Sequence, residues 1–229
     1  MIYKYFARIG RVLTLLNDSI LYLSHPDQFN DPYDRLLCFD KRLDENGDPY
    51  TLPQIQYCGV GNSVGITCFS ARNDSMLMWS HYANSHKGVC IGFEIPQAEQ
   101  AMKRNEPEYF DLGLKASVCF QPVSYDKSMY TLHYDGGFFI GGDDAIRTVT
   151  EKIMDYDYER EIRLISLNES RQPVAVPRTW IRELIFGTFT TKGTKGRLRN
   201  LAATNNIVVK QMYLGGGRLG RMECRNERN

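Results

Sequence analysis

"WIRELIFGTFTTKGTKGRLRNLAATNNIVVKQMYL", from Trp180 to Leu214, is the stretch that decides the fold. Its two ends, WIRELIF and IVVKQMYL, are rich in β-branched and other apolar residues, which predicts two strands. A turn of glycine and threonine residues follows the first strand, and KGRLRNLAATNN then predicts a helix. The order strand, helix, strand predicts a chain that combines helices with a sheet.

The rest of the chain adds more strands than helices. Strands are predicted in MIYKYF (1–6), ILYLS (20–24), SVGITCFS (63–70), GVCIGFEI (88–95), ASVCFQPVSYD (116–126) and the end of YDYEREIRLIS (156–166). Helices are predicted in RIGRVLTLLNDS (8–19), in NDSMLMWSHYANSH (73–86), with Asn73 or Asp74 as N-cap, and from Ala98 to Asn105. We therefore expect an α+β fold with split mixed β-sheets and flanking helices. Residues 1–214 should form a single domain, and the glycine-rich residues 215–229 a flexible C-terminal tail.

Length and composition limit the classes of protein to which this chain can belong. A chain of 229 residues can bury one substantial core. Its formal net charge of +1 gives no global case for binding nucleic acid or membrane, although a local basic patch is compatible with it. No run of about eighteen apolar residues and no cleavable leader pattern occur, so a soluble, cytoplasmic protein is expected. The six cysteines form no CxxC pair, which argues against a zinc site.

The densest cluster of reactive side chains lies in MWSHYANSHKGVCIGFE, residues 78–94. Cys90 is expected to be an inert core thiol, because it lies inside a buried strand. His81 and His86 are five residues apart, which on a helix is about 500° and places them on different faces, so a metal site is not expected from this pair. Trp79 should be largely buried, which leaves His81, Tyr82 and Lys87 as candidates for a pocket wall.

Two groups of carboxylates are the other candidates. The first is an acidic group in a polar loop: Asp27, Asp31, Asp34 and Asp40. It could hold a divalent cation for phosphoester cleavage, although turn-building carboxylates are commoner in such a loop. In the second, Glu159 and Glu161 alternate with Arg160, so on a strand both carboxylates would face one side. They could stabilise a developing positive charge at a cleft, or form ion pairs on an exposed edge strand.

The ordered motifs YKYF, ILYLSHPDQFNDPYD, ITCFS, MLMWSHYANSHKGVCIGFE and YEREIRLI resemble a prokaryotic family known as domain of unknown function 2971. The resemblance extends from about Tyr3 to Gly187. The family name implies no activity.

A more distant resemblance implies one. A strand carrying YK, a short helix and ILYLS are similar to the opening of ADP-ribosyltransferases of the DNA-modifying toxin type, and the strand that begins at Glu161 is similar to the one that bears their catalytic glutamate. This resemblance implies an ADP-ribosyltransferase-like core, with NAD bound as substrate and a nucleic acid or protein as acceptor, in a toxin or phage-defence setting. Lys4 departs from the pattern, because the superfamily usually has His or Arg there.

The resemblance also implies roles for individual residues. Glu161 and His81 would be catalytic, and Asn30, Asp31 and Asp34 would contact the substrate. A larger set would bind NAD: Lys4, Tyr5, Ser70, Trp79, Tyr82 and Arg163. No metal and no membrane are implied.

Two other functions stay open. A metal-dependent nuclease or phosphodiesterase would use Asp31, Asp34 and His81. A non-catalytic ligand-sensing module would instead tie up Glu161 and His81 in structural hydrogen bonds, with no cavity beside them.

Overall fold

The computed structural model describes residues 1–31, 36–43, 46, 49–53, 64–114, 118–127, 131–132, 146–167, 169–214 and 222–226. The helices are α1 (Ile9–Asp18), α2 (Met76–Tyr82), α3 (Pro96–Arg104) and α5 (Lys192–Thr204), with short 3-10 helices η1 (Pro26–Gln28), η4 (Met154–Glu159) and η5 (Arg178–Trp180). The strands are β1 (Ile2–Phe6), β2 (Ile20–Leu23), β3 (Leu36–Leu43), β4 (Pro49–Pro53), β5 (Gly65–Ser70), β6 (Val89–Phe93), β7 (Glu108–Phe110), β8 (Val118–Pro122), β9 (Ser124–Asp126), β10 (Thr131–Leu132), β11 (Glu151–Ile153), β12 (Glu161–Ser166), β13 (Gln172–Ala175), β14 (Ile181–Phe186), β15 (Val208–Leu214) and β16 (Met222–Asn226).

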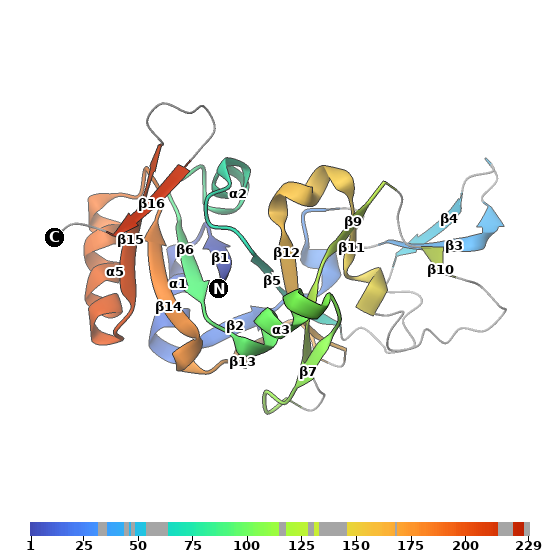
Figure 1. Cartoon of the computed structure of the whole chain (residues 1–229), viewed down its shortest axis with the longest axis horizontal. Helices are drawn as coiled ribbons and strands as arrows, with labels where there is room; N and C mark the ends of the chain where they lie inside the picture. The colour runs from blue at the N-terminus through green and yellow to red at the C-terminus, as the bar shows by residue number, and fades with distance from the viewer. Residues whose placement is uncertain are drawn as a thin grey trace.

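One mixed sheet of nine strands forms the framework, in the order β16-β15-β14-β6-β1-β5-β12-β8-β7 (Figure 1). The strand-helix-strand unit predicted at Trp180 to Leu214 is β14, α5 and β15, and its two strands pair in parallel. The other neighbours in this sheet pair antiparallel. The predicted α+β class and the mixed character of the sheet are therefore confirmed. Three small sheets accompany it, β10-β3-β4, β11-β9 and β13-β2.

The large sheet is nearly divided between β1 and β5. These strands share one residue pair in register, Tyr3 with Ser70, whereas β1 pairs with β6 along its whole length. Farther along β5, Ile66 bridges to Ser24 instead, beyond the end of β2. Sequence analysis predicted split sheets, but the large sheet is continuous. One residue pair between β1 and β5, Tyr3 with Ser70, still joins its two halves, and we call this narrow connection the joint.

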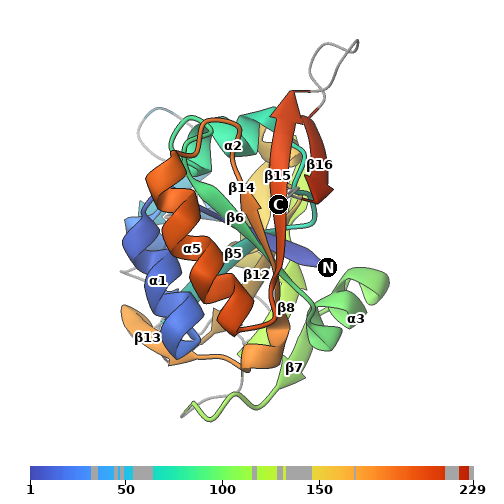
Figure 2. The ribbon, with the colours of Figure 1, turned by 90° about the vertical axis from the view of Figure 1, so that its left-hand side faces the viewer.

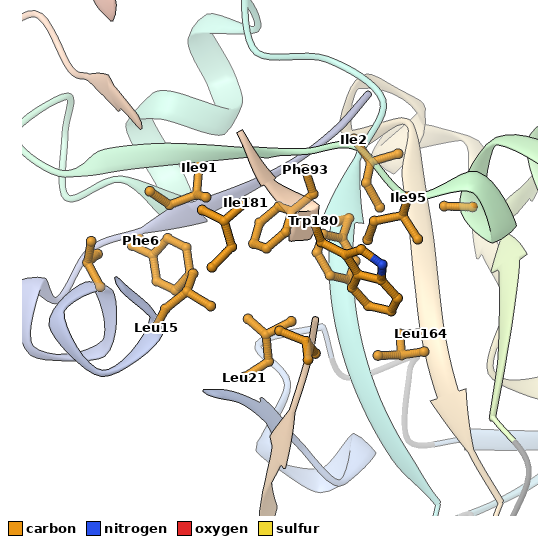
Figure 3. Packing of buried hydrophobic residues seen from close by; sticks show 14 of the residues in the cluster. Ile2, Phe6, Leu15, Leu21, Ile91, Phe93, Ile95, Leu164, Trp180 and Ile181 are labelled. Carbon is orange, nitrogen blue, oxygen red and sulfur yellow. The ribbon is translucent and has the colours of Figure 1, made fainter. Parts of the chain in front are cut away.

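Apolar residues cover both faces of the sheet near its centre. Alternate residues of a strand point to opposite faces, so Ile91 joins the larger core with α1 and α5, while Cys90 packs with Trp79 of α2 on the other face. This double burial explains why GVCIGF is apolar throughout. Figure 3 shows the larger core, where Phe6, Leu15 and Ile181 converge.

The predicted helices form, but one cap differs. Ser75 is the N-cap of α2, and its hydroxyl accepts a hydrogen bond from the backbone N–H of Met78 at 3.3 Å. Asn73 and Asp74 were the expected caps. The Asp74 carboxylate instead pairs with Arg72 at 2.9 Å, and the Asn73 carbonyl accepts the indole N–H of Trp79 at 2.7 Å.

The segment expected as a flexible tail contains a strand. Within residues 215–229, β16 pairs antiparallel with β15, for example Cys224 with Met212. Its sequence, MECRN, lacks the apolar alternation that predicts a strand, and the exposed edge of β15 supplies the pairing partner. No helix in the described ranges is long and apolar enough to cross a membrane.

Candidate functional site

A cavity of about 250 Å³ opens where β1 and β5 separate. Most of the predicted site residues line it: Lys4 and Tyr5 of β1, Asn30 and Asp31 after η1, Ser70 at the end of β5, Tyr82 of α2 and Glu161 of β12. These residues lie far apart in the sequence, and the topology brings them together because β1, β5 and β12 are neighbours in the sheet. The cavity is the candidate functional site.

Glu161 is the most firmly held carboxylate of the cavity. The Arg163 guanidinium donates from Nε to Oε1 at 3.1 Å and from Nη2 to Oε2 at 2.9 Å, a bidentate geometry. The ammonium of Lys152 lies 3.1 Å from Oε2. Burial opposes ionisation, but the two cations outweigh it and hold the pKa of Glu161 well below its usual range. Glu161 is therefore a fixed negative charge.

Glu159 has the opposite electrostatic character. Its Oε2 accepts from Lys152 Nζ at 2.8 Å, and its Oε1 accepts from the Tyr82 hydroxyl at 2.5 Å. Burial and the neighbouring Glu161 carboxylate raise the pKa of Glu159 above its usual range. The site therefore pairs an ionised carboxylate with one that holds a proton more readily, bridged by one buried lysine.

The expected placement of both carboxylates on one side is observed, but by a different backbone. Glu159 ends η4 and Glu161 begins β12, while Arg160 between them adopts a left-handed conformation with φ 44°. This turn directs the Arg160 side chain outward, where it pairs with Asp157 at 3.1 Å.

Lys152 is a site residue that the sequence analysis missed. It lines the cavity from β11 and is buried, although Glu151 and Ile153 beside it are not. A lysine in a short strand is ordinarily exposed, and the sequence EKI contains no pattern that would predict burial of Lys152. A buried lysine needs acidic partners, and only the fold shows that Glu159 and Glu161 supply them.

Lys4 and Ser70 hold the joint of the sheet as well as lining the cavity. The Lys4 ammonium donates to the Cys68 carbonyl at 2.9 Å and so links β1 to β5 where their backbones have separated. Burial lowers the pKa of Lys4. The Ser70 hydroxyl donates to the Glu159 carbonyl at 2.6 Å and accepts from the Arg72 N–H at 3.1 Å, so its hydrogen-bonding capacity is largely used.

Three predicted site residues do not line the cavity. Trp79 is fully buried in the smaller core, against Tyr5 at 5.2 Å between ring centroids. Arg163 lies behind Glu161, where its Nη1 also donates to the Val149 carbonyl at 2.6 Å. His81 is exposed on α2, with its ring 6.3 Å from that of Tyr158. These three side chains therefore do not form the wall of this cavity. Trp79 and His81 belong to α2, which presents Tyr82 to the cavity instead, and Arg163 affects the cavity through Glu161.

The acidic loop is described in part. Asp31 is buried and lines the cavity beside Asn30, whereas Asp34 lies outside the described residues. Asp27 instead pairs with His25, at 3.0 Å, and with Arg171. Among the described residues, no group of three or more His, Cys, Asp and Glu side chains could hold a metal ion.

A second hollow of about 200 Å³ adjoins the cavity. The two share Lys4, Arg11 and Ser24 in their linings. The second hollow is otherwise bordered mainly by apolar and aromatic groups of β1, β2 and β13, including Leu21 and Tyr22, with Thr14 of α1. Two cationic side chains therefore lie between an acidic hollow and a largely apolar one.

The family match can be placed on this geometry. Residues 78–164 match the family model described as protein of unknown function (DUF2971). This part of the chain belongs to the DUF2971 family. The predicted family is thus confirmed, over a shorter range than the motifs indicated. The DUF2971 region spans α2 to β12 and includes Tyr82, Lys152, Glu159 and Glu161, but not Lys4 or the rest of β1 and β5. No curated protein and no solved structure matches the chain.

Proposed function

We propose that the cavity binds NAD and that the protein is an ADP-ribosyltransferase-like enzyme. The observation that carries the proposal is the convergence of Lys4, Tyr5, Ser70, Tyr82 and Glu161, from four separate elements, on one cavity. The non-catalytic alternative predicts that Glu161 and His81 are both tied up in structural hydrogen bonds, with no adjoining cavity. Glu161 is tied up, but it borders open space, which favours the enzymatic alternative.

The charge state of Glu161 suits this chemistry. Cleavage of the bond between nicotinamide and ribose develops positive charge on the ribose, and a preorganised anion stabilises that charge. Arg163 and Lys152 keep Glu161 ionised and fix the positions of its oxygens before substrate arrives. No reorganisation is then needed during the reaction, which is the main advantage of such a site.

The order of polar and apolar groups along the two adjoining hollows supports a dinucleotide as ligand. One hollow holds the carboxylates and the other is largely apolar, with Lys4 and Arg11 between them. A bound NAD would place its nicotinamide ribose beside Glu161 and its diphosphate beside the two cations. Its adenosine would then contact the apolar hollow. Macromolecular acceptors, either nucleic acid or protein, would approach the ribose from solvent.

Thermal-shift titration with NAD tests the proposal. A ligand that binds only the folded state stabilises it, by about 2.7 kcal/mol at a ligand concentration of 100 times Kd. This stabilisation raises the melting temperature. We expect such a shift in the natural sequence, and a smaller one in Tyr82→Phe, which removes the cavity hydroxyl that donates to Glu159. Glu99→Gln on the exposed face of α3 is the control and should behave as the natural sequence. The absence of a shift at saturating NAD would overturn the proposal.

Nicotinamide release tests the catalytic step separately. Glu161→Gln should abolish release while NAD still shifts the melting temperature, because the amide keeps the shape but lacks the charge. Unchanged release in that variant would show that Glu161 is not the catalytic carboxylate. The metal-dependent alternative predicts another pattern, in which a chelator abolishes activity and a divalent cation restores it.

A further inference from the structure

The positive charge of the chain is concentrated near its C-terminus. Residues 187–229 contain nine lysines and arginines and two glutamates, a formal net charge of +7. Since the whole chain has +1, residues 1–186 carry −6. α5 contains four basic residues and no acidic one. The nearly neutral total therefore conceals a basic region that is continuous in sequence.

Four of the described basic residues are exposed on neighbouring elements of the fold. α5, β15 and β16 lie together at one end of the sheet (Figure 2), and we name their exposed side chains the basic face. Lys192, Arg197 and Arg199 are exposed on α5, and Arg225 is exposed on β16. An open hollow of about 730 Å³ lies on this face, lined by Lys195, Tyr213, Arg225 and neighbouring polar groups.

One exposed aromatic ring lies beside a cation of the basic face, and another precedes α5 in the chain. Phe189, just before α5, is 57% exposed, and Tyr213 of β15 is 42% exposed. The Arg225 guanidinium lies 5.7 Å from the centroid of the Tyr213 ring. Cations beside accessible aromatic faces can contact phosphates and stack on unpaired bases at the same time.

We propose that the basic face binds single-stranded nucleic acid. Phosphates would contact the cations of α5 and β16, and bases would stack on Tyr213 and Phe189. An anionic membrane fits less well, because an interfacial helix needs a free apolar face, whereas Leu198 and Ala202 of α5 are buried against the sheet. The hollow of the basic face shares no lining residue with the NAD cavity, so this proposal does not depend on the proposed function.

Fluorescence anisotropy with labelled DNA and RNA oligonucleotides of about 20 nucleotides, in the absence of NAD, tests the proposal. We expect binding at about 50 mM salt that weakens steeply as salt increases. The double variant R197E/R225E should bind at least about tenfold more weakly, with a shallower salt dependence. K103E/R104E on α3 changes the net charge equally, at exposed positions away from the basic face, and should bind as the natural sequence.

A third variant separates stacking from charge. Tyr213→Ala should weaken binding of single strands about tenfold and leave the weaker binding of duplex unchanged, since paired bases cannot stack on the ring. Equal affinities of R197E/R225E and K103E/R104E would overturn the proposal. So would tighter binding to vesicles of anionic phospholipid than to oligonucleotides, or a preference for duplex. Thermal unfolding of each variant verifies that it is folded.

Discussion

Lys152 is the residue on which the charge balance of the candidate site depends. It contacts both Glu159 and Glu161, and all three side chains are buried. A buried ion pair contributes little over an apolar replacement, but removal of one partner leaves an uncompensated charge. The cluster is therefore sensitive to the loss of any one member.

We expect Lys152→Met to lower the free energy of unfolding by about 3–5 kcal/mol, because two carboxylates would lose their shared cation. Urea denaturation measures the change. Lys103→Met is the matched control, since it removes an exposed pair with Glu99 and should cost at most about 1 kcal/mol. Similar losses in both variants would contradict the role assigned to Lys152.

The low pKa of Glu161 predicts a pH dependence of stability. A carboxylate whose pKa is lower in the folded state than its ordinary value of 4.5 stabilises the fold above that pH. This contribution is lost as pH falls below about 4.5 toward the folded-state pKa. The difference in unfolding free energy between the natural sequence and Glu161→Gln should therefore shrink as pH falls from 5 toward 3. A difference that stays constant across this range, measured by urea denaturation, would contradict the assignment.

At the scale of elements, α2 links the cavity to the smaller core. Its N-cap is Ser75, its Trp79 is buried, and its Tyr82 contacts Glu159. The position of Tyr82 in the cavity therefore depends on how α2 begins and on how it meets β6.

Loss of the N-cap should loosen this helix. Ser75→Ala removes the acceptor for the Met78 N–H and should cost about 1 kcal/mol. Asp74→Ala removes only the exposed pair with Arg72 and should change stability by less than about 1 kcal/mol. Chemical denaturation measures both changes. A larger effect of Asp74→Ala would indicate that Asp74 is the functional cap, as the sequence predicted.

Replacement of two glycines by alanine should change the stability of the protein in opposite directions. A Cβ at Gly88, between α2 and β6, would lie 2.2 Å from the Phe6 carbonyl oxygen, so Gly88→Ala should destabilise the protein severely. A Cβ at Gly196, inside α5, would meet nothing within 4 Å, so Gly196→Ala should stabilise by about 0.5–1 kcal/mol. Melting temperatures that fall or rise together in the two variants would contradict this reading of the packing.

At the scale of the molecule, the first strand in the sequence occupies the centre of the sheet. β1 lies between β6 and β5, whereas β16 lies at the far edge (Figure 1). A central strand supports both halves of the sheet, and an edge strand supports one neighbour.

Truncations should reveal this difference. Deletion of residues 1–6 should abolish cooperative thermal unfolding, because it removes the joint and the Lys4 bridge. Deletion of residues 215–229 removes the edge strand β16, which pairs with β15 alone among the described strands, and should leave a cooperative transition. Circular dichroism during heating distinguishes the two. A cooperative transition without β1 would contradict the central role of this strand.

Local sequence was sufficient to predict most elements. Apolar runs such as GVCIGF and ITCFS, and the unit from Trp180 to Leu214, predicted their strands and helices because these signals depend on neighbours in the chain. The motifs also predicted the DUF2971 family and many residues of the cavity. The burial of Trp79 and Cys90 followed from their apolar surroundings.

The tertiary structure alone decided the rest. β16 forms because the edge of β15 is available to pair with it, and Lys152 is buried because Glu159 of η4 and Glu161 of β12 converge on it. His81 does not line the cavity, whereas Tyr82 on the same helix does. These outcomes depend on contacts between distant segments. Residue types and spacing determine which local elements form and which faces are apolar, but electrostatic partners are set by the packing of the elements.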